Sequence, residues 1–198
     1  MLFRSLNVNA GDRVMMLGMN SRSFLLTWLA VMKRGAIFVP VNTELKGAFL
    51  EHQVRNSEPR VVFVDASLRH AFDTISLEGI GIETTVWTEP DDAVLPEPLG
   101  ASELLAFAGL AATPADPDDV VPAGPSDICT IMYTSGTTGP SKGVLMPQGH
   151  CFLFGRNMAR SFAMDHTDLM YICMPFFHAM GLPIQLLGSL IAGAQCHV

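Results

Sequence analysis

The sequence predicts an α/β protein with mainly parallel sheets flanked by helices. Two observations lead to this prediction: short runs rich in β-branched and aromatic residues recur along the chain, and segments with helical spacing of apolar residues separate them. Strands joined through helices of ten or more residues are typical of βαβ units, in which the strands run parallel. With 198 residues and 49% hydrophobic content, the chain can bury a sizeable core.

The first 88 residues show the clearest alternation of strand and helix patterns. We expect strands at 13–18, 36–41, 60–65 and 84–87, and helices at 21–34 and 47–56. Ser21 is a suitable N-cap for the first helix because its hydroxyl can accept a backbone N–H, and Gly35 is a suitable residue to end it. The run RVVFVD at 60–65 is typical of a strand buried on both faces.

The composition changes over 89–126, where more than half of the chain's prolines lie beside several aspartates. We expect a surface connection there, with one short helix at 102–108. A strand at 127–133 then leads into a Thr/Ser/Gly loop, followed by a helix at 149–162 and strands at 169–173 and 195–198. The apolar stretch 179–194 is too short and too interrupted to span a bilayer, so we expect a core helix.

The charge and the cysteines exclude several classes of protein. A net charge of −7 without a Lys/Arg cluster opposes binding to nucleic acid. The four cysteines lack the close spacing of zinc or redox motifs, and the histidines show no metal-like spacing, so we expect no metal bound by the chain itself. We interpret the cysteines as reduced, buried thiols of a cytoplasmic protein, because no secretory signal is present at the start.

The stretch 133–144, YTSGTTGPSKGV, combines residues that suit phosphate binding. Its glycines let backbone N–H groups turn toward an anion, its hydroxyls add donors, and Lys142 supplies a mobile positive charge. The order of residues fits neither the common nucleotide-binding P-loop nor the dinucleotide pattern. A polar surface turn is the alternative, but generic turns seldom combine this hydroxyl density and glycine spacing with a terminal lysine. The stretch therefore predicts a phosphate-binding loop.

TSGTTGPSKG also resembles the signature loop of the adenylate-forming, or AMP-binding, superfamily, which includes acyl-CoA synthetases, luciferases and the adenylation domains of peptide synthetases. In that family the loop holds the β- and γ-phosphates of ATP. The resemblance implies this role for Thr134, Ser135, Gly136, Thr137, Thr138, Gly139 and Lys142. Ser141 stands where the family most often has proline.

Two further stretches resemble the same family. MKRGAIFVPVN at 32–42, with GDRV at 11–14 and the pair Asn20-Ser21 upstream, is similar to a Gly-Ala-x-x-x-Pro segment of the family. MPFFHAMGL at 174–182 is similar to the motif whose aromatic or histidine residue borders the acyl pocket. A histidine considered alone is more often structural. The resemblance implies that His178 gates the carboxylate pocket without having to transfer a proton, and that Met180, Gly181 and Leu182 lie beside it.

The resemblance implies an acyl-CoA synthetase or ligase with ATP, Mg²⁺ and coenzyme A as cofactors. A carboxylate and ATP would give acyl-AMP and pyrophosphate, and coenzyme A would then give the thioester and AMP. The apolar residues Phe176, Phe177 and Leu186 favour a fatty or other hydrophobic acid over an amino acid, as in fatty acid metabolism.

The resemblance extends from about Gly11 to the end of the chain. We therefore expect residues 1–198 to be part of an N-terminal AMP-binding domain, divided into the first βαβ units (1–88), the surface connection (89–126) and the segment with the phosphate loop and acyl pocket (127–198). The family's later Thr-Glu motif, ribose-binding aspartate and C-terminal domain with its lysine have no counterpart here. We expect a fragment or truncated gene product that does not complete the reaction alone.

Two other functions stay open from the sequence. The chain could be a non-catalytic module that binds a nucleotide or another phosphate compound, in which case the missing motifs would be genuine absences. It could also be a structural or partner-binding α/β domain, although three motifs in the family's order would then be coincidence.

Overall fold

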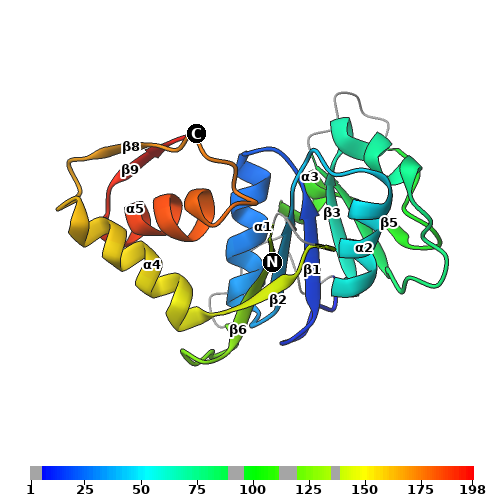
Figure 1. Ribbon diagram of the computed structural model, residues 1–198, viewed down its shortest axis with the longest axis horizontal. Helices are drawn as coiled ribbons and strands as arrows, with labels where there is room; N and C mark the ends of the chain where they lie inside the picture. The colour runs from blue at the N-terminus through cyan, green and yellow to red at the C-terminus, as the bar shows by residue number, and fades with distance from the viewer. Residues whose placement is uncertain (1–5, 89–95, 112–119, 135–138) are drawn as a thin grey trace.

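The computed structural model describes residues 6–88, 96–111, 120–134 and 139–198, and a seven-stranded sheet is its main feature (Figure 1). The strand order is β5-β4-β3-β1-β2-β6-β7, and every neighbouring pair is parallel except β6 and β7. The strands are β1 (Arg13–Leu17), β2 (Ile37–Val41), β3 (Val61–Asp65), β4 (Thr84–Thr88), β5 (Glu103–Ala106), β6 (Ile128–Tyr133) and β7 (Gly143–Pro147). The predicted α/β class with mainly parallel strands is confirmed.

Helices cover both faces of this sheet. The helical segments of this part are α1 (Arg22–Lys33), α2 (Gly47–Ser57), the 3₁₀ helix η1 (Ala66–Thr74) and α3 (Phe107–Ala111). Side chains alternate along β1, so that Val14 and Met16 pack with α1 on one face while Met15 and Leu17 pack with α2 on the other. Burial on both faces explains why these strands are almost continuously apolar.

The ends of α1 are set by the residues that the sequence indicated. Ser21 Oγ accepts a hydrogen bond of 3.2 Å from Phe24 N–H, which satisfies one of the free donors at the start of the helix. Gly35 follows the last turn with a φ of +63°, a conformation that a residue with a side chain adopts at a cost. Both predictions are confirmed.

The predicted helix at 102–108 is wrong. Glu103–Ala106 form β5 at the edge of the sheet, paired in parallel with β4, and helix α3 begins only at Phe107. The backbone hydrogen bonds to β4 outweigh the preference of this short segment for a helix. Part of the expected surface connection therefore belongs to the sheet, and Leu99 within it is buried.

Strand β7 was not predicted. After the phosphate loop the chain turns back as β7, which runs antiparallel to β6 with Tyr133 opposite Gly143. The predicted helix follows as α4 (Gln148–Ser161). The phosphate loop is thus the connection of a β-hairpin, and both of its ends are held by neighbouring strands.

The last third of the chain forms a smaller part beside the sheet, on the left of Figure 1. It consists of α4, the π-helix η2 (Met180–Leu186), α5 (Leu187–Ala192) and a parallel pair of short strands, β8 (Leu169–Tyr171) and β9 (Gln195–His197). The expected helix over 179–194 is present, but it begins as a π-helix and continues as an α-helix. Pro183 has no N–H to donate, and Ile184 N–H donates to Ala179 O, five residues back, as is typical of a π-helix.

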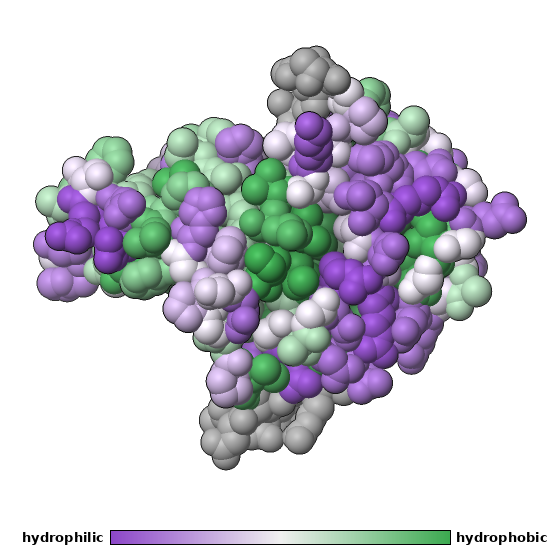
Figure 2. All heavy atoms as spheres, turned by 60° about the horizontal axis from the view of Figure 1, so that its bottom comes forward, coloured by the Kyte–Doolittle hydropathy of each residue, from purple (hydrophilic) through white to green (hydrophobic). Residues whose placement is uncertain are grey.

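The surface is apolar in places. Figure 2 shows one face on which hydrophobic side chains gather between the smaller part on the left and the more hydrophilic surface on the right. Several large exposed hydrophobic side chains belong to the smaller part: Phe152, Leu153, Phe162, Leu169, Tyr171, Leu190, Ile191 and Val198. Among the residues described, no helix combines the length and the apolar character needed to cross a membrane.

The expectation of four buried thiols is correct only for two cysteines. All four are free, but Cys173 is exposed and Cys196 is half-buried. Cys129 and Cys151 are buried with their sulfur atoms 3.6 Å apart. The contact with Cys151, together with burial, raises the pKa of Cys129 above its ordinary value, so this thiol stays protonated.

Candidate functional site

The two ends of the predicted phosphate loop are tied together by hydrogen bonds. Thr134 N–H donates to Lys142 O at 3.1 Å, and Lys142 N–H donates to Thr134 Oγ1 at 3.2 Å. The side chain of Lys142 takes no part in these bonds and is exposed. Ser135, Gly136, Thr137 and Thr138 lie outside the described residues, so their role stays a prediction.

Gly139 gives the loop open space for an anion. A Cβ placed on it would meet nothing within 4 Å, and its φ of +146° is a conformation that residues with side chains rarely adopt. Glycine at this position leaves the backbone accessible, as expected for a loop that surrounds a phosphate.

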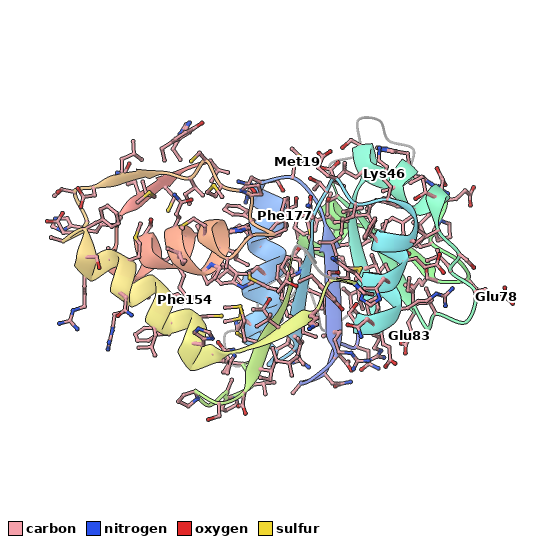
Figure 3. The ribbon with its side chains drawn as sticks, viewed as in Figure 1. Met19, Lys46, Glu78, Glu83, Phe154 and Phe177 are labelled. Carbon is pink, nitrogen blue, oxygen red and sulfur yellow. The ribbon has the colours of Figure 1, made fainter. Side chains whose placement is uncertain are left out.

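A hollow of about 440 Å³ brings together three stretches that are far apart in the sequence. It lies beside the carboxyl ends of the parallel strands β2 and β6, the usual position of ligands in open α/β sheets. Figure 3 shows Met19, Lys46 and Phe177 near this edge. The lining residues come from the β2–α2 segment (Pro40, Asn42, Leu45, Phe49 and Gln53), from the loop region (Tyr133, Thr134, Gly139 and Ser141) and from Phe177 and His178.

His178 reaches the hollow with a defined tautomer. Its Nδ1 accepts a hydrogen bond of 3.1 Å from Met180 N–H, so the proton of the neutral ring sits on Nε2, which can donate. Met180 and Gly181 do not line the hollow: Met180 is 42% exposed, and Gly181 is buried against the backbone of Met174 and Pro175. Their predicted place beside the acyl pocket stays a prediction.

Asn20 is a functional candidate whose role the sequence did not show. Its Nδ2 donates to Met174 O at 3.0 Å, and its Oδ1 accepts from Phe176 N–H at 2.7 Å. One amide thus holds the segment that carries Phe177 and His178 against the end of β1. The sequence places Asn20 directly before the helix cap, but nothing local indicates a partner more than 150 residues away.

Helix α2 also contacts the phosphate loop, which the sequence did not predict. Tyr133 OH donates to Asn56 Oδ1 at 2.7 Å, and His52 and Gln53 both contact Ser141. Partial burial raises the pKa of the Tyr133 hydroxyl above its ordinary value.

We expect Tyr133→Phe to lower the free energy of unfolding by about 1 kcal/mol at pH 7, since one hydrogen bond of the folded state is lost. The difference should shrink above about pH 10, the ordinary tyrosine pKa. A raised pKa in the folded state means that the unfolded chain releases its proton first, so the wild type loses stability there. Urea denaturation of both proteins from pH 7 to 11 measures this, and a constant difference would contradict the assignment.

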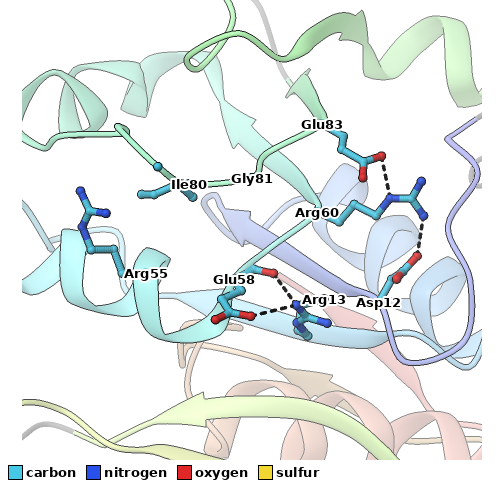
Figure 4. Close-up of a pocket in the computed structure, with 9 residues that line it drawn as sticks. Asp12, Arg13, Arg55, Glu58, Arg60, Ile80, Gly81 and Glu83 are labelled. Atoms are coloured by element: carbon cyan, nitrogen blue, oxygen red, sulfur yellow. Dashed lines mark hydrogen bonds and ion pairs between the residues drawn. The ribbon is translucent and has the colours of Figure 1, made fainter.

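A second hollow, shown in Figure 4, lies at the opposite edge of the sheet and is lined by charged residues. Arg60 donates to Asp12 at 2.8 Å and to Glu83 at 2.7 Å, and Arg13 pairs with Glu58. These carboxylates, Asp12 first, raise the pKa of Arg60 above its ordinary value. Because the guanidinium groups are engaged within the protein, we interpret this hollow as structural.

No group of three or more His, Cys, Asp or Glu side chains in the described ranges could hold a metal ion. The candidate site is therefore the hollow that joins the phosphate loop, the β2–α2 segment and His178.

Comparison with known proteins gives consistent matches over the whole chain. The sequence profile of the family described as "AMP-binding enzyme" matches residues 1–198. A feruloyl-CoA synthase from Amycolatopsis is 31% identical over 96% of the chain, and a 3-hydroxybenzoate–CoA ligase from Aromatoleum is 28% identical over 94%. The crystal structure of an anthranilate CoA ligase with anthranoyl-AMP superposes with a TM-score of 0.85 at 24% identity, covering 98% of this chain and 36% of that one. The chain spans about a third, 34%, of the length of both curated relatives.

Proposed function

Because the chain belongs to the family of AMP-binding enzymes, we propose that the protein containing it activates a carboxylic acid with ATP and transfers the acyl group to coenzyme A. One observation carries the proposal: the three stretches that resemble the family meet in a single hollow. The relatives named as CoA synthase and CoA ligase support the reaction class.

The loop suits the triphosphate of ATP. Backbone N–H groups near Gly139, the Thr134 hydroxyl and the Lys142 ammonium would hold the β- and γ-phosphates, and Gly139 leaves room for them. In adenylation the carboxylate oxygen attacks the α-phosphorus and pyrophosphate leaves. Lys142 would neutralise charge that grows on the departing pyrophosphate, which lowers the barrier because the donor is already in place.

His178 would face the acid. Its Nε2–H can donate a hydrogen bond to an oxygen of the carboxylate and orient the acid in the hollow. Since Nδ1 is occupied by Met180 N–H, the neutral ring can do this without releasing or taking up a proton. Mg²⁺ and coenzyme A enter the proposal through the family and the relatives' names alone.

We propose that the acid is hydrophobic, although only one of the three apolar residues expected to favour such an acid lines the hollow. Phe176 and Leu186 are buried in the core and do not line the hollow, whereas Phe177 does. The apolar wall is completed instead by Leu45, Phe49 and Pro40. Relatives named for ferulate and 3-hydroxybenzoate make aromatic acids the first candidates. A cytoplasmic location stays a prediction.

Pyrophosphate release tests the proposal. A full-length protein that carries this chain is incubated with ATP, Mg²⁺ and a panel of aromatic acids, aliphatic acids and amino acids. We expect release that depends on the acid, and thioester formation once coenzyme A is added. Nucleotide binding without release for any acid would instead support the non-catalytic binding module.

A further inference from the structure

We infer that His52 and Gln53, adjacent residues of α2, are positioning residues for the phosphate loop. They hold Ser141, and through it the neighbouring Lys142, in place for the anion. The inference rests on the proposed function of the loop, but the contacts are independent of it. Nothing in the sequence or in the relatives' names assigns these two residues a role.

The two contacts fix both the backbone and the side chain of Ser141. His52 Nε2 lies 2.8 Å from Ser141 O, and because a carbonyl oxygen only accepts, the ring nitrogen is the donor. Gln53 Nε2 donates to Ser141 Oγ at 3.2 Å. A residue held by its carbonyl and its hydroxyl at once has little freedom to rotate.

Gln53 is well placed to hold the loop because its own side chain is fixed. It is only 4% exposed, and it belongs to a helix whose residues Leu50 and Val54 are buried in the core. A side chain held by packing loses little further entropy when it makes a hydrogen bond, so the contact with Ser141 is preorganised.

The amide of Gln53 also has one unused acceptor. Its Oε1 is buried with no hydrogen-bond partner in the part of the chain that the structure describes, although the residue lines the candidate hollow. A buried acceptor without a partner costs free energy, so most such groups in native proteins are paired. An N–H or O–H donor of the loop would satisfy it.

Helix α2 holds the loop on both sides. At the start of the loop, Tyr133 OH bonds to Asn56, and near its end Ser141 bonds to His52 and Gln53. The loop ends are also bonded to each other through Thr134 and Lys142. These attachments leave the Lys142 ammonium free to contact phosphate while its backbone stays in place.

The first test measures the loop without any ligand. In Gln53→Met, which keeps the side-chain length but removes the donor, we expect hydrogen exchange of the Lys142 amide to be about fivefold faster, the loss of one net hydrogen bond. Gln185→Met, a matched change in η2, should leave this amide unchanged. Ser141→Ala removes the same bond from the other side and keeps the test valid if Gln53→Met does not fold. Unchanged exchange in the variants would overturn the inference.

The second test measures ATP binding by the same proteins. We expect Gln53→Met to weaken ATP affinity about fivefold, the loss of one net hydrogen bond, and Gln185→Met to bind ATP as the wild type does. A purely structural role for Gln53 would lower the midpoint of unfolding of Gln53→Met without changing its ATP affinity. Equal ATP affinity of wild type and Gln53→Met would refute the positioning role. If a full-length protein with the wild-type sequence of this chain does not bind ATP while the exchange result holds, the proposed function fails and the attachment of the loop stands.

Discussion

Replacement of Gly181 by alanine is expected to lower the free energy of unfolding by about 3 kcal/mol. A Cβ on this residue would lie 2.3 Å from Pro175 O and 2.7 Å from Met174 O, and these are backbone atoms that cannot rotate away. The same two carbonyls accept hydrogen bonds from His178 N–H and Asn20 Nδ2. The substitution should therefore also displace the segment that brings His178 to the hollow.

Urea denaturation followed by circular dichroism measures this change. Gly81→Ala is the matched control, because a Cβ at Gly81 meets nothing within 4 Å and its φ is not positive. We expect the control to stay within about 0.5 kcal/mol of the wild type. A Gly181→Ala protein as stable as the control would show that the segment 174–181 has room for the added methyl group.

Lys142→Ala is expected to weaken ATP binding by about 10- to 100-fold, the usual contribution of a hydrogen bond to a charged group. The loop should keep its shape, since the bonds between Lys142 and Thr134 use only the backbone of the lysine. The substitution thus removes the positive charge and little else.

Isothermal titration with ATP measures the loss, with Arg160→Ala as a control that removes one exposed positive charge at the far end of α4. The control should bind as the wild type does. Equal affinity of Lys142→Ala and wild type would mean that the lysine does not contact the triphosphate. An equal loss in both variants would point to overall charge as the cause.

Patterns among neighbouring residues of the sequence were sufficient to predict the central part of the fold. The apolar run of β1, the hydroxyl of Ser21 and the glycine at position 35 each act on immediate neighbours, so the sequence shows their effect directly. The phosphate loop was recognised for the same reason, since its hydroxyls, glycines and lysine are contiguous.

Elements that depend on distant partners were missed. Residues 103–106 become a strand only because β4 offers an unpaired edge, and β7 exists because β6 lies beside it. Asn20 bonds to Met174 and Phe176, and Ser141 bonds to α2, across separations that no local pattern encodes. These long-range contacts place the predicted site residues relative to one another.

The central claim is that the loop between β6 and β7 recognises the phosphate chain of ATP. Titration of the isotope-labelled 198-residue chain with ATP, AMP and inorganic tripolyphosphate, followed by the amide NMR signals of Thr134, Gly139 and Lys142, tests it most directly. We expect ATP and tripolyphosphate to shift these signals and AMP to shift them far less, because only the first two carry β- and γ-phosphates. Equal shifts with AMP, or shifts confined to residues away from the loop, would contradict the claim.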